Sequence, residues 1–336
     1  MKKKYLAAGA VTGAVGAAIA WKLLSRPKEV IWKEVAGKVA HADKSHFVNV
    51  DGVRVHFQEF GDPHGPILLL VHGFTASTYV WKSVAPLLGE EGFRVIAVDL
   101  PGFGYSAKPA AFDYTIQSQA RFISRFMNRL GIGRATVVGS SYGGAVSLTL
   151  ALDYPERVEK LVLVDAVIND EAKAHPVMMM AAIPGVGEVI TPFFLDSRRF
   201  MRVRMQNTLA PANHHLITED RISSILRPLS GADGHHSVLA SGRNWHATRL
   251  ERDAHLINQP TLIIWGDQDR VIRIENGYKL HNAILNSRFV VLKDCGHVPS
   301  EEKSELFTEL VTEFCRDRKG RIEEREGDEV RLEKAS

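Results

Sequence analysis

Short, continuous apolar runs recur along this 336-residue chain and constrain its fold more than any other feature. The first run, Ile67–Val71, reads ILLLV and lies between Pro66 and His72. A run of this length without polar alternation is typical of a β-strand that is buried on both faces. Comparable runs occur at residues 94–98, 135–138, 160–164, 261–265 and 288–292. We therefore expect these runs to be the strands of an internal sheet.

Stretches with helical periodicity separate these runs. Between Gln119 and Leu130, apolar residues recur three or four positions apart, which places them on one face of a helix. Strands that alternate with helices form βαβ units, so we predict an α/β fold with a mostly parallel central sheet and helices on both faces. Ligands of such sheets bind beyond the carboxyl ends of the strands. Upstream, alternating apolar and polar residues from His46 to Glu59 predict a β-hairpin.

The pattern divides the chain into five segments. Residues 29–166 and 251–315 contain the apolar runs and are predicted to form the two parts of one core. Residues 167–250 contain no clear buried strand, and we predict a helical cap over the carboxyl edge of the sheet. Residues 316–336 alternate charges of both signs with few apolar residues, which indicates a solvated charged tail. Residues 1–28 form a hydrophobic N-terminal segment.

The N-terminal segment has two interpretations. Lysines at positions 2–4 precede an apolar run from Tyr5 to Leu24, which is about long enough to cross a bilayer as a helix. We predict that this helix remains as an anchor, which would make the protein membrane-anchored. The alternative is export after signal cleavage, because Ala18-Ile19-Ala20 resembles a signal-peptidase site.

Composition argues against several other classes of protein. The formal net charge is only +3, so we expect no nucleic-acid partner. Cys295 and Cys315 lack the spacing of a metal site and are interpreted as free thiols. Two pairs of adjacent histidines have no acidic or thiol partners at ligand spacing, so we predict no metal site. Gly102-Phe103-Gly104 lacks the third glycine of a dinucleotide site, and the sequence makes no prediction of oligomeric state.

A candidate nucleophile follows the apolar run at 135–138. Gly139-Ser140-Ser141-Tyr142-Gly143 matches G-x-S-x-G and precedes an apolar stretch with helical character. This order of strand, tight turn and helix holds the serine hydroxyl above the sheet edge. We predict Ser141 as the nucleophile.

A serine hydroxyl needs a base, and that base needs an acid to orient it. His297 is the candidate base, because among the histidines it alone follows the last apolar run and precedes the last helix. Asp269 is the preferred acid, in a loop that follows the preceding run. Asp267 in the same loop and Asp165 after its own run remain alternatives.

An oxyanion needs two preorganised hydrogen-bond donors. The backbone N–H of Tyr142, beside the nucleophile, is the first candidate. The backbone N–H of Phe74, in the loop after the run Ile67–Val71, is the second. His72 is interpreted as a brace for that loop.

Several motifs together resemble the α/β-hydrolase superfamily. They are His72-Gly73-Phe74 with Trp81 downstream, the loop DLPGFGYS at 99–106, the elbow GSSYGG, the loop WGDQD and the motif CGHVP. The resemblance covers roughly residues 48–315 and is closest in kind to bacterial esterases and lipases and to membrane-anchored monoacylglycerol lipases. It implies a small-molecule ester or lipid substrate, such as a monoacylglycerol, and no cofactor.

We therefore predict a carboxylic ester hydrolase, an esterase or lipase that works through an acyl-enzyme. Alternatives on the same fold are a C–C bond hydrolase of meta-cleavage type and a cofactor-free perhydrolase. Epoxide hydrolases are disfavoured, because they carry an aspartate at the elbow where this chain has Ser141. A non-enzymatic receptor or membrane-tethered scaffold is also disfavoured, because such proteins usually lack one of the three triad residues.

Overall fold

The computed structural model describes residues 27–171, 176–317 and 330–333. These residues include a nine-stranded sheet with the order β1-β2-β4-β3-β5-β6-β7-β8-β9. Its strands are β1 (Ser45–Val50), β2 (Val53–Gly61), β3 (Ile67–Val71), β4 (Arg94–Val98), β5 (Ala135–Ser140), β6 (Val158–Val164), β7 (Thr261–Gly266), β8 (Ser287–Leu292) and β9 (Val330–Glu333). Strands β3 to β8 pair in parallel, whereas β1, β2 and β9 are antiparallel to their neighbours. The predicted α/β fold with a mostly parallel sheet is confirmed.

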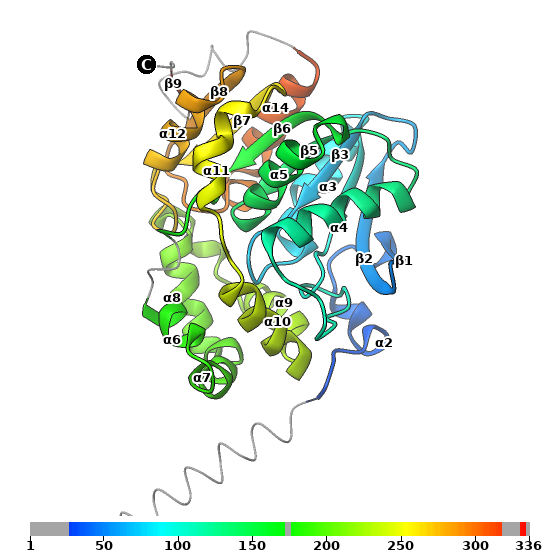
Figure 1. Cartoon of the computed structure of the whole chain (residues 1–336), viewed down its shortest axis with the longest axis vertical. Helices are drawn as coiled ribbons and strands as arrows, with labels where there is room; N and C mark the ends of the chain where they lie inside the picture. The colour runs from blue at the N-terminus through cyan, green and yellow to red at the C-terminus, as the bar shows by residue number, and fades with distance from the viewer. Residues whose placement is uncertain (1–26, 172–175, 318–329, 334–336) are drawn as a thin grey trace, which may run out of the picture.

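Helices cover both faces of this sheet (Figure 1). In the core they are α3 (Val84–Glu90), α4 (Ile116–Arg129), α5 (Tyr142–Asp153), α11 (Thr248–Asp253), α12 (Glu275–Ala283), α13 (Pro299–Glu302) and α14 (Ser304–Cys315), with the short α2 (Trp32–Val35) before β1. One apolar cluster packs the sheet against α4, α5, α11 and α12, and a second packs it against α3 and α14. The core therefore has two layers, one on each face.

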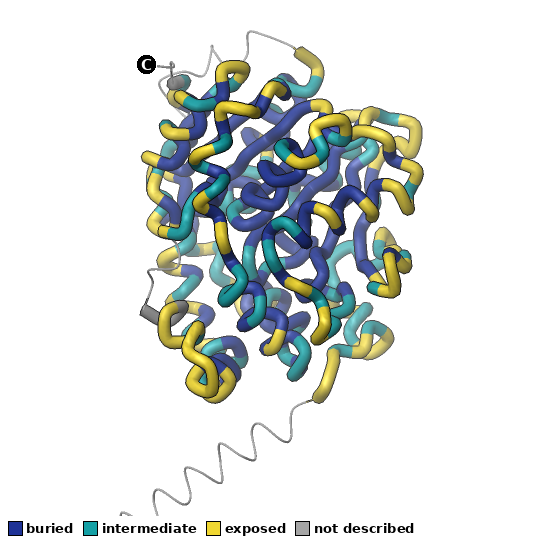
Figure 2. Tube along the Cα trace, viewed as in Figure 1, coloured by how far each residue is buried: buried dark blue, intermediate teal, exposed yellow. Residues whose placement is uncertain are grey.

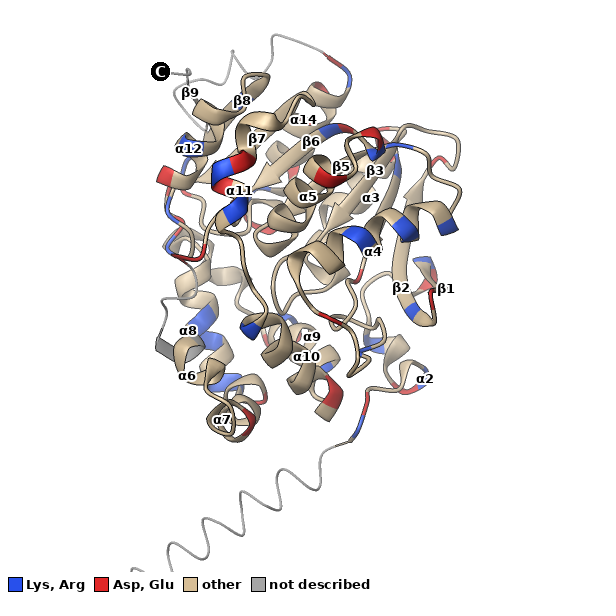
Figure 3. Cartoon of the chain, in the orientation of Figure 1, with Lys and Arg blue, Asp and Glu red and all other residues tan. Residues whose placement is uncertain are grey.

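Strand β3 shows why a continuous apolar run is needed here. Leu69 and Val71 belong to the first apolar cluster, and Leu68 and Leu70 belong to the second. Successive side chains of a strand point to opposite faces, so a strand covered on both sides has no solvent-facing position. Figure 2 shows the central strands in the colour of buried residues, and Figure 3 shows β3, β5 and β7 without charged side chains.

Five helices form a separate group at one end of the sheet (Figure 1). They are α6 (Pro176–Ala182), α7 (Val186–Leu195), α8 (Arg198–Thr208), α9 (Glu219–Leu226) and α10 (Ala232–Arg243). Met201 and Met205 of α8 pack against Ile222 and Leu226 of α9 in a small apolar cluster of their own. These helices fall within the segment 167–250 for which we predicted a helical cap. The next helix, α11, already packs on the core through Leu250.

Part of the charged tail has regular structure. Residues Val330 to Glu333 form β9, which pairs antiparallel with β8 at the edge of the sheet. Val330 is fully buried, while Arg331 between it and Leu332 is exposed. Alternation of this kind over a few residues is enough to extend an existing sheet edge. The overall composition of the tail hid this short strand.

The prediction of a membrane-anchored protein is wrong. No helix in residues 27–171, 176–317 or 330–333 is both long and apolar enough to cross a bilayer. The run between Tyr5 and Leu24, on which that prediction and the alternative of a cleaved signal depended, lies outside the described residues. Half of that run is Ala or Gly, so its length suggested a membrane helix more strongly than its hydrophobicity did.

Candidate active site

Ser141 occupies a sharp turn between β5 and α5. Its φ is 54° and its ψ is −117°, a backbone conformation that non-glycine residues rarely adopt. The Ser141 N–H donates to the Val164 carbonyl at 2.9 Å, which ties the turn to the sheet. A Cβ on Gly139 would lie 2.4 Å from the Gly143 carbonyl oxygen, and a Cβ on Gly143 would lie 2.2 Å from the Val71 carbonyl oxygen. The turn therefore needs glycine at both positions, as a nucleophile elbow does.

Three side chains from separate loops form one hydrogen-bonded chain at the carboxyl edge of the sheet. His297, after β8, places Nε2 3.0 Å from Ser141 Oγ. Its Nδ1 lies 2.8 Å from Oδ2 of Asp269, which follows β7. The Asp269 side chain is fully buried and the His297 side chain is only 9% exposed. The structure thus brings together the three residues that the sequence singled out, at distances suited to a nucleophile, a base and an orienting acid.

The loop after β7 explains why Asp269 rather than Asp267 reaches the imidazole. Asp269 Oδ1 accepts the N–H groups of Val271 at 2.7 Å and Ile272 at 3.1 Å, which leaves Oδ2 for His297. Asp267 is exposed and instead accepts the backbone N–H of Cys295 at 3.2 Å. Cys295 lies in the loop after β8 that carries His297, here called the histidine loop. The two aspartates therefore have different partners although they are two residues apart.

The two predicted oxyanion donors lie next to the nucleophile. Tyr142 is the first residue of α5, where a backbone N–H has no acceptor within the helix. The Phe74 N–H donates to no residue in the described ranges of the chain. Its neighbour Gly73 packs so closely that a Cβ there would lie 3.2 Å from Ser141 Cβ. Both N–H groups therefore remain unused beside the serine, as stabilisation of an oxyanion requires.

Aromatic side chains pack around these donors. The rings of Phe74, Tyr142 and Trp245 lie with centroids 5.1 to 5.9 Å apart. Burial raises the pKa of Tyr142, so its phenol stays neutral. Trp245 lies between α10 and α11, so its contact with Phe74 joins the end of the cap segment to the loop after β3, here called the oxyanion loop. Trp245 was not predicted, because its only signal in the sequence is a lone tryptophan in a polar stretch.

His72 braces the loop that carries Phe74. Its Nδ1 lies 2.8 Å from the Gly73 carbonyl oxygen, and its Nε2 lies 3.1 Å from the backbone nitrogen of Leu100. Because the Leu100 N–H donates, Nε2 must accept and Nδ1 must carry the proton. Burial lowers the pKa of His72, which favours this neutral form.

Glu302 joins the histidine loop to the cap. Its Oε2 accepts the backbone N–H groups of Ala210 at 2.8 Å and Gly296 at 3.0 Å, and the Asn213 side-chain amide at 2.8 Å. Its Oε1 accepts the Val298 N–H at 3.2 Å. One buried carboxylate therefore holds both sides of the base and the segment after α8. Glu302 was not predicted, and its only signal in the sequence is an acidic residue five positions after the candidate base.

Arg204 of α8 reaches the oxyanion loop from the cap. Its Nη2 donates to Thr75 Oγ1 at 2.7 Å, and Thr75 Oγ1 donates to the Phe74 carbonyl at 2.6 Å. No carboxylate of the described residues pairs with Arg204, and burial lowers the pKa of its guanidinium. Arg204 was not predicted, because its contact with Thr75 depends on how the cap packs against the core.

Asp165, Asp269 and His297 are the one group in the described residues whose spacing could suit a metal ion. One ligand atom from each lies within 4.8 Å of the others. A metal there would need a nitrogen of His297, and both ring nitrogens are already engaged, with Ser141 and Asp269. The geometry fits a proton-transfer chain better than a metal site.

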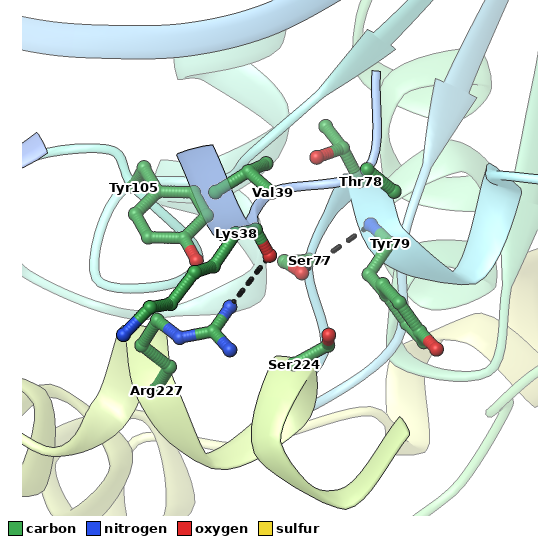
Figure 4. Close-up of a pocket in the computed structure, with 9 residues that line it drawn as sticks. Lys38, Val39, Ser77, Thr78, Tyr79, Tyr105, Ser224 and Arg227 are labelled. Carbon is green, nitrogen blue, oxygen red and sulfur yellow. Dashed lines mark hydrogen bonds between the residues drawn. The ribbon is translucent and has the colours of Figure 1, made fainter. Parts of the chain in front are cut away.

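A small, partly open pocket lies away from these residues (Figure 4). Its walls come from the segment before β1, the segment before α3, the loop after β4 and the end of α9, and include Lys38, Tyr79, Tyr105 and Arg227. Arg227 Nη1 donates to the Lys38 carbonyl at 2.9 Å across it. Ser141, His297 and Asp269 do not line this pocket, so it is not the reaction centre.

Comparison with known proteins identifies the fold family. A family model described as the alpha/beta hydrolase fold matches residues 66–304. This range includes the elbow with Ser141, the loop with Asp269 and the loop with His297. The chain belongs to the α/β-hydrolase family. The predicted resemblance is therefore confirmed, and the protein is a hydrolase.

Individual relatives of this α/β-hydrolase span almost its whole core. It is 32% identical over 270 residues to an uncharacterized hydrolase, YugF, of Bacillus subtilis, which covers 80% of this chain and 96% of that protein. It is 29% identical over 283 residues to a 2-hydroxy-6-oxononadienedioate/2-hydroxy-6-oxononatrienedioate hydrolase of Burkholderia vietnamiensis, covering 81% and 96%. Among solved structures, a membrane phospholipase A matches with a TM-score of 0.64 and 24% identity over 94% of this chain and 99% of that one. The last similarity shows the fold alone.

Proposed function

We propose that this α/β-hydrolase cleaves carboxylic esters through an acyl-enzyme, with Ser141 as nucleophile, His297 as base and Asp269 as the acid that orients the base. The observation that carries the proposal is the continuous hydrogen-bonded chain from Ser141 Oγ through both nitrogens of His297 to the buried Asp269 carboxylate. A serine at a strained elbow with such a chain is equipped for acyl transfer.

The reaction takes two steps. His297 Nε2 removes the proton from Ser141 Oγ as the oxygen attacks the ester carbonyl, and the imidazolium then donates that proton to the leaving alcohol. Water, deprotonated by the same nitrogen, then attacks the acyl-enzyme, and the imidazolium returns that proton to Ser141 Oγ as the bond to the acyl group breaks and the acid is released. The N–H groups of Phe74 and Tyr142 hold the oxyanion in both tetrahedral intermediates.

An acyl-length series of 4-nitrophenyl esters, from acetyl to palmitoyl, tests the proposal with the full chain. We expect turnover in the wild type and a loss on the order of a million-fold in kcat for Ser141→Ala. Ser140→Ala is the matched control, because it removes a neighbouring buried hydroxyl outside the hydrogen-bonded chain. Activity that survives Ser141→Ala would refute the nucleophile, and the preferred acyl length would separate an esterase from a lipase.

One observation favours a second candidate, hydrolysis of a C–C bond in an acid-bearing substrate. The Burkholderia relative is named for a substrate with two carboxylates. Arg204 offers a cation without a carboxylate partner among the described residues, bonded to Thr75 beside the oxyanion loop. A guanidinium in such a place suits a substrate carboxylate.

The two candidates are separated by comparing three substrates. They are 4-nitrophenyl pentanoate, mono-4-nitrophenyl glutarate, which has a similar acyl length but an added carboxylate, and a 2-hydroxy-6-oxo-dienoate. If kcat/KM is highest for the dienoate, the second candidate replaces the first. If only the esters react, ester hydrolysis stands. If the wild type also prefers the glutarate ester over the pentanoate ester and Arg204→Met does not, Arg204 is the residue that binds the substrate carboxylate.

A further inference from the structure

Asp165 is a second carboxyl group in the buried cluster around the proposed base. Asp165 directly follows β6, which lies in the sheet between β5 and β7, the strands that precede Ser141 and Asp269. It is fully buried, with a φ of 43°. Its Oδ1 accepts the Gly266 N–H at 3.0 Å, whereas its Oδ2 receives no hydrogen bond from the described residues. A carboxylate oxygen of Asp165, one of Asp269 and a nitrogen of His297 all lie within 4.8 Å of one another.

The two aspartates are unequally provided with donors. Asp269 accepts three hydrogen bonds, from Val271, Ile272 and His297, and all three favour its ionised form. Asp165 accepts only one. Two carboxylates this close in a buried site cannot both be ionised without a large electrostatic cost, so one of them keeps a proton. The pKa of Asp165 is raised well above its ordinary value, by burial first and by the charge of Asp269 second.

No cation is paired with Asp165 among the described residues, and the positive charge of Lys303 near this cluster acts on the Cys295 thiol. Glu302 adds a further negative charge near Asp165, and the thiol of Cys295, whose pKa is raised by burial, contributes none. No lysine or arginine in the described part of the chain forms an ion pair with Asp165. The groups that face Asp165 are thus Asp269, His297, Glu302 and Cys295, and of the carboxyls Asp165 has the fewest donors.

We infer that Asp165 is a positioning residue whose protonated carboxyl donates its unshared Oδ2–H to the Asp269 carboxylate. The inference rests on the proposed function, since it concerns the acid of the same chain. The bond adds a donor to Asp269 beyond those of its own loop and keeps a single negative charge beside the imidazole. An apolar residue at position 165 would leave the Asp269 carboxylate without this donor. An ionised Asp165 would repel the Asp269 carboxylate.

Two substitutions test this role. Asp165→Asn is isosteric and neutral, and its amide supplies both a donor for Asp269 and an acceptor for the Gly266 N–H. Asp165→Ala removes both. The readouts are the pH profile of kcat/KM for the best ester and the pH dependence of the rate at which a fluorophosphonate modifies Ser141. Asp220→Asn, an exposed aspartate of α9, controls for the loss of one formal charge.

For Asp165→Asn we expect rates within about threefold of wild type and an acid limb whose midpoint moves by less than about 0.3 pH units, because the charge near His297 does not change. For Asp165→Ala we expect kcat to fall about tenfold with KM within about twofold, since only the orientation of the base is affected. If Asp165 were ionised in the wild type, Asp165→Asn would remove a charge about 5 Å from the imidazole and lower that midpoint by about one unit or more. Such a shift, or an unchanged rate in Asp165→Ala, would overturn the inference.

The two readouts distinguish the possible failures. A wild type that hydrolyses no ester but is modified at Ser141 refutes ester hydrolysis and leaves the labelling profile to decide on Asp165. A wild type that is neither active nor labelled refutes the Ser141–His297 pair and with it the role of Asp165.

Discussion

Glu302 offers the sharpest test of how the cap and the histidine loop are held together. Its carboxylate accepts four N–H donors, three of them at Oε2, from Ala210, Asn213 and Gly296, and one at Oε1, from Val298. Glutamine has nearly the same shape but only one acceptor oxygen and no charge. If that oxygen keeps the three shared donors, the amide NH₂ meets the Val298 N–H, and a donor then faces a donor.

The magnitude follows from these contacts. A hydrogen bond to a charged group contributes about 1.5–3 kcal/mol, and the neutral equivalent contributes roughly half of that. A buried N–H without an acceptor costs about 1–3 kcal/mol. After allowance for local relaxation, we expect Glu302→Gln to lower the free energy of unfolding by about 3–5 kcal/mol, or Tm by about 10 °C.

The assay is thermal unfolding followed by calorimetry, together with ester hydrolysis at 25 °C. We expect kcat to fall because the Val298 N–H, next to His297, loses its acceptor and the bond from the Gly296 N–H loses its charge assistance, while KM changes less. Glu305→Gln is the matched control, since Glu305 is exposed on α14, and its Tm should stay within about 1 °C of wild type. A Tm for Glu302→Gln within about 2 °C of wild type would refute this account of the loop.

Three further predictions concern the elbow, a buried ion pair and the pH dependence of stability. Gly143→Ala places a methyl group 2.2 Å from the Val71 carbonyl oxygen and should cost at least about 3 kcal/mol in urea unfolding; a variant as stable as wild type would contradict this packing. Arg221→Met leaves Glu301 buried without its partner at 2.9 Å and should cost about 3–5 kcal/mol, whereas the double variant with Glu301→Leu should recover most of it; equal losses in the two variants would count against a coupled pair. The raised pKa of Asp165 means that the folded protein binds this proton more tightly than the unfolded chain does. The free energy of unfolding should therefore fall as the pH rises above about 4 through the folded pKa, and the advantage of Asp165→Asn over wild type should grow with pH in that window; a constant difference would show that the pKa is not raised.

The sheet and the elbow were predictable because their signals are local. The run Ile67–Val71 is apolar at every position, and only a strand covered on both faces needs that pattern. The G-x-S-x-G motif places glycines where the backbone packs within van der Waals contact, so it carries steric information about the turn itself. Hydropathy was less informative at the ends of the chain, where a run of moderate hydrophobicity suggested an anchor and a charged composition hid β9.

The partners of the site depended on the fold. Asp165, Asp267 and Asp269 each follow a predicted strand, and the sequence favoured Asp269 without excluding the other two. The choice depends on how two loop N–H groups occupy one oxygen of Asp269 and leave the other free. Glu302 and Arg204 went unnoticed for the same reason, since their partners are 92 and 129 residues away along the chain.

The sequence by itself determined the architecture of this hydrolase and its elbow, because apolar periodicity and glycine spacing are properties of neighbouring residues, and it supplied candidates for the histidine and its acid. Only the tertiary structure decided which carboxyl is hydrogen-bonded to His297, which one binds the backbone on both sides of it, and which one lies beside Asp269 in the buried cluster. Those roles depend on distances between loops that follow different strands, and on how many donors each carboxylate receives when the loops meet.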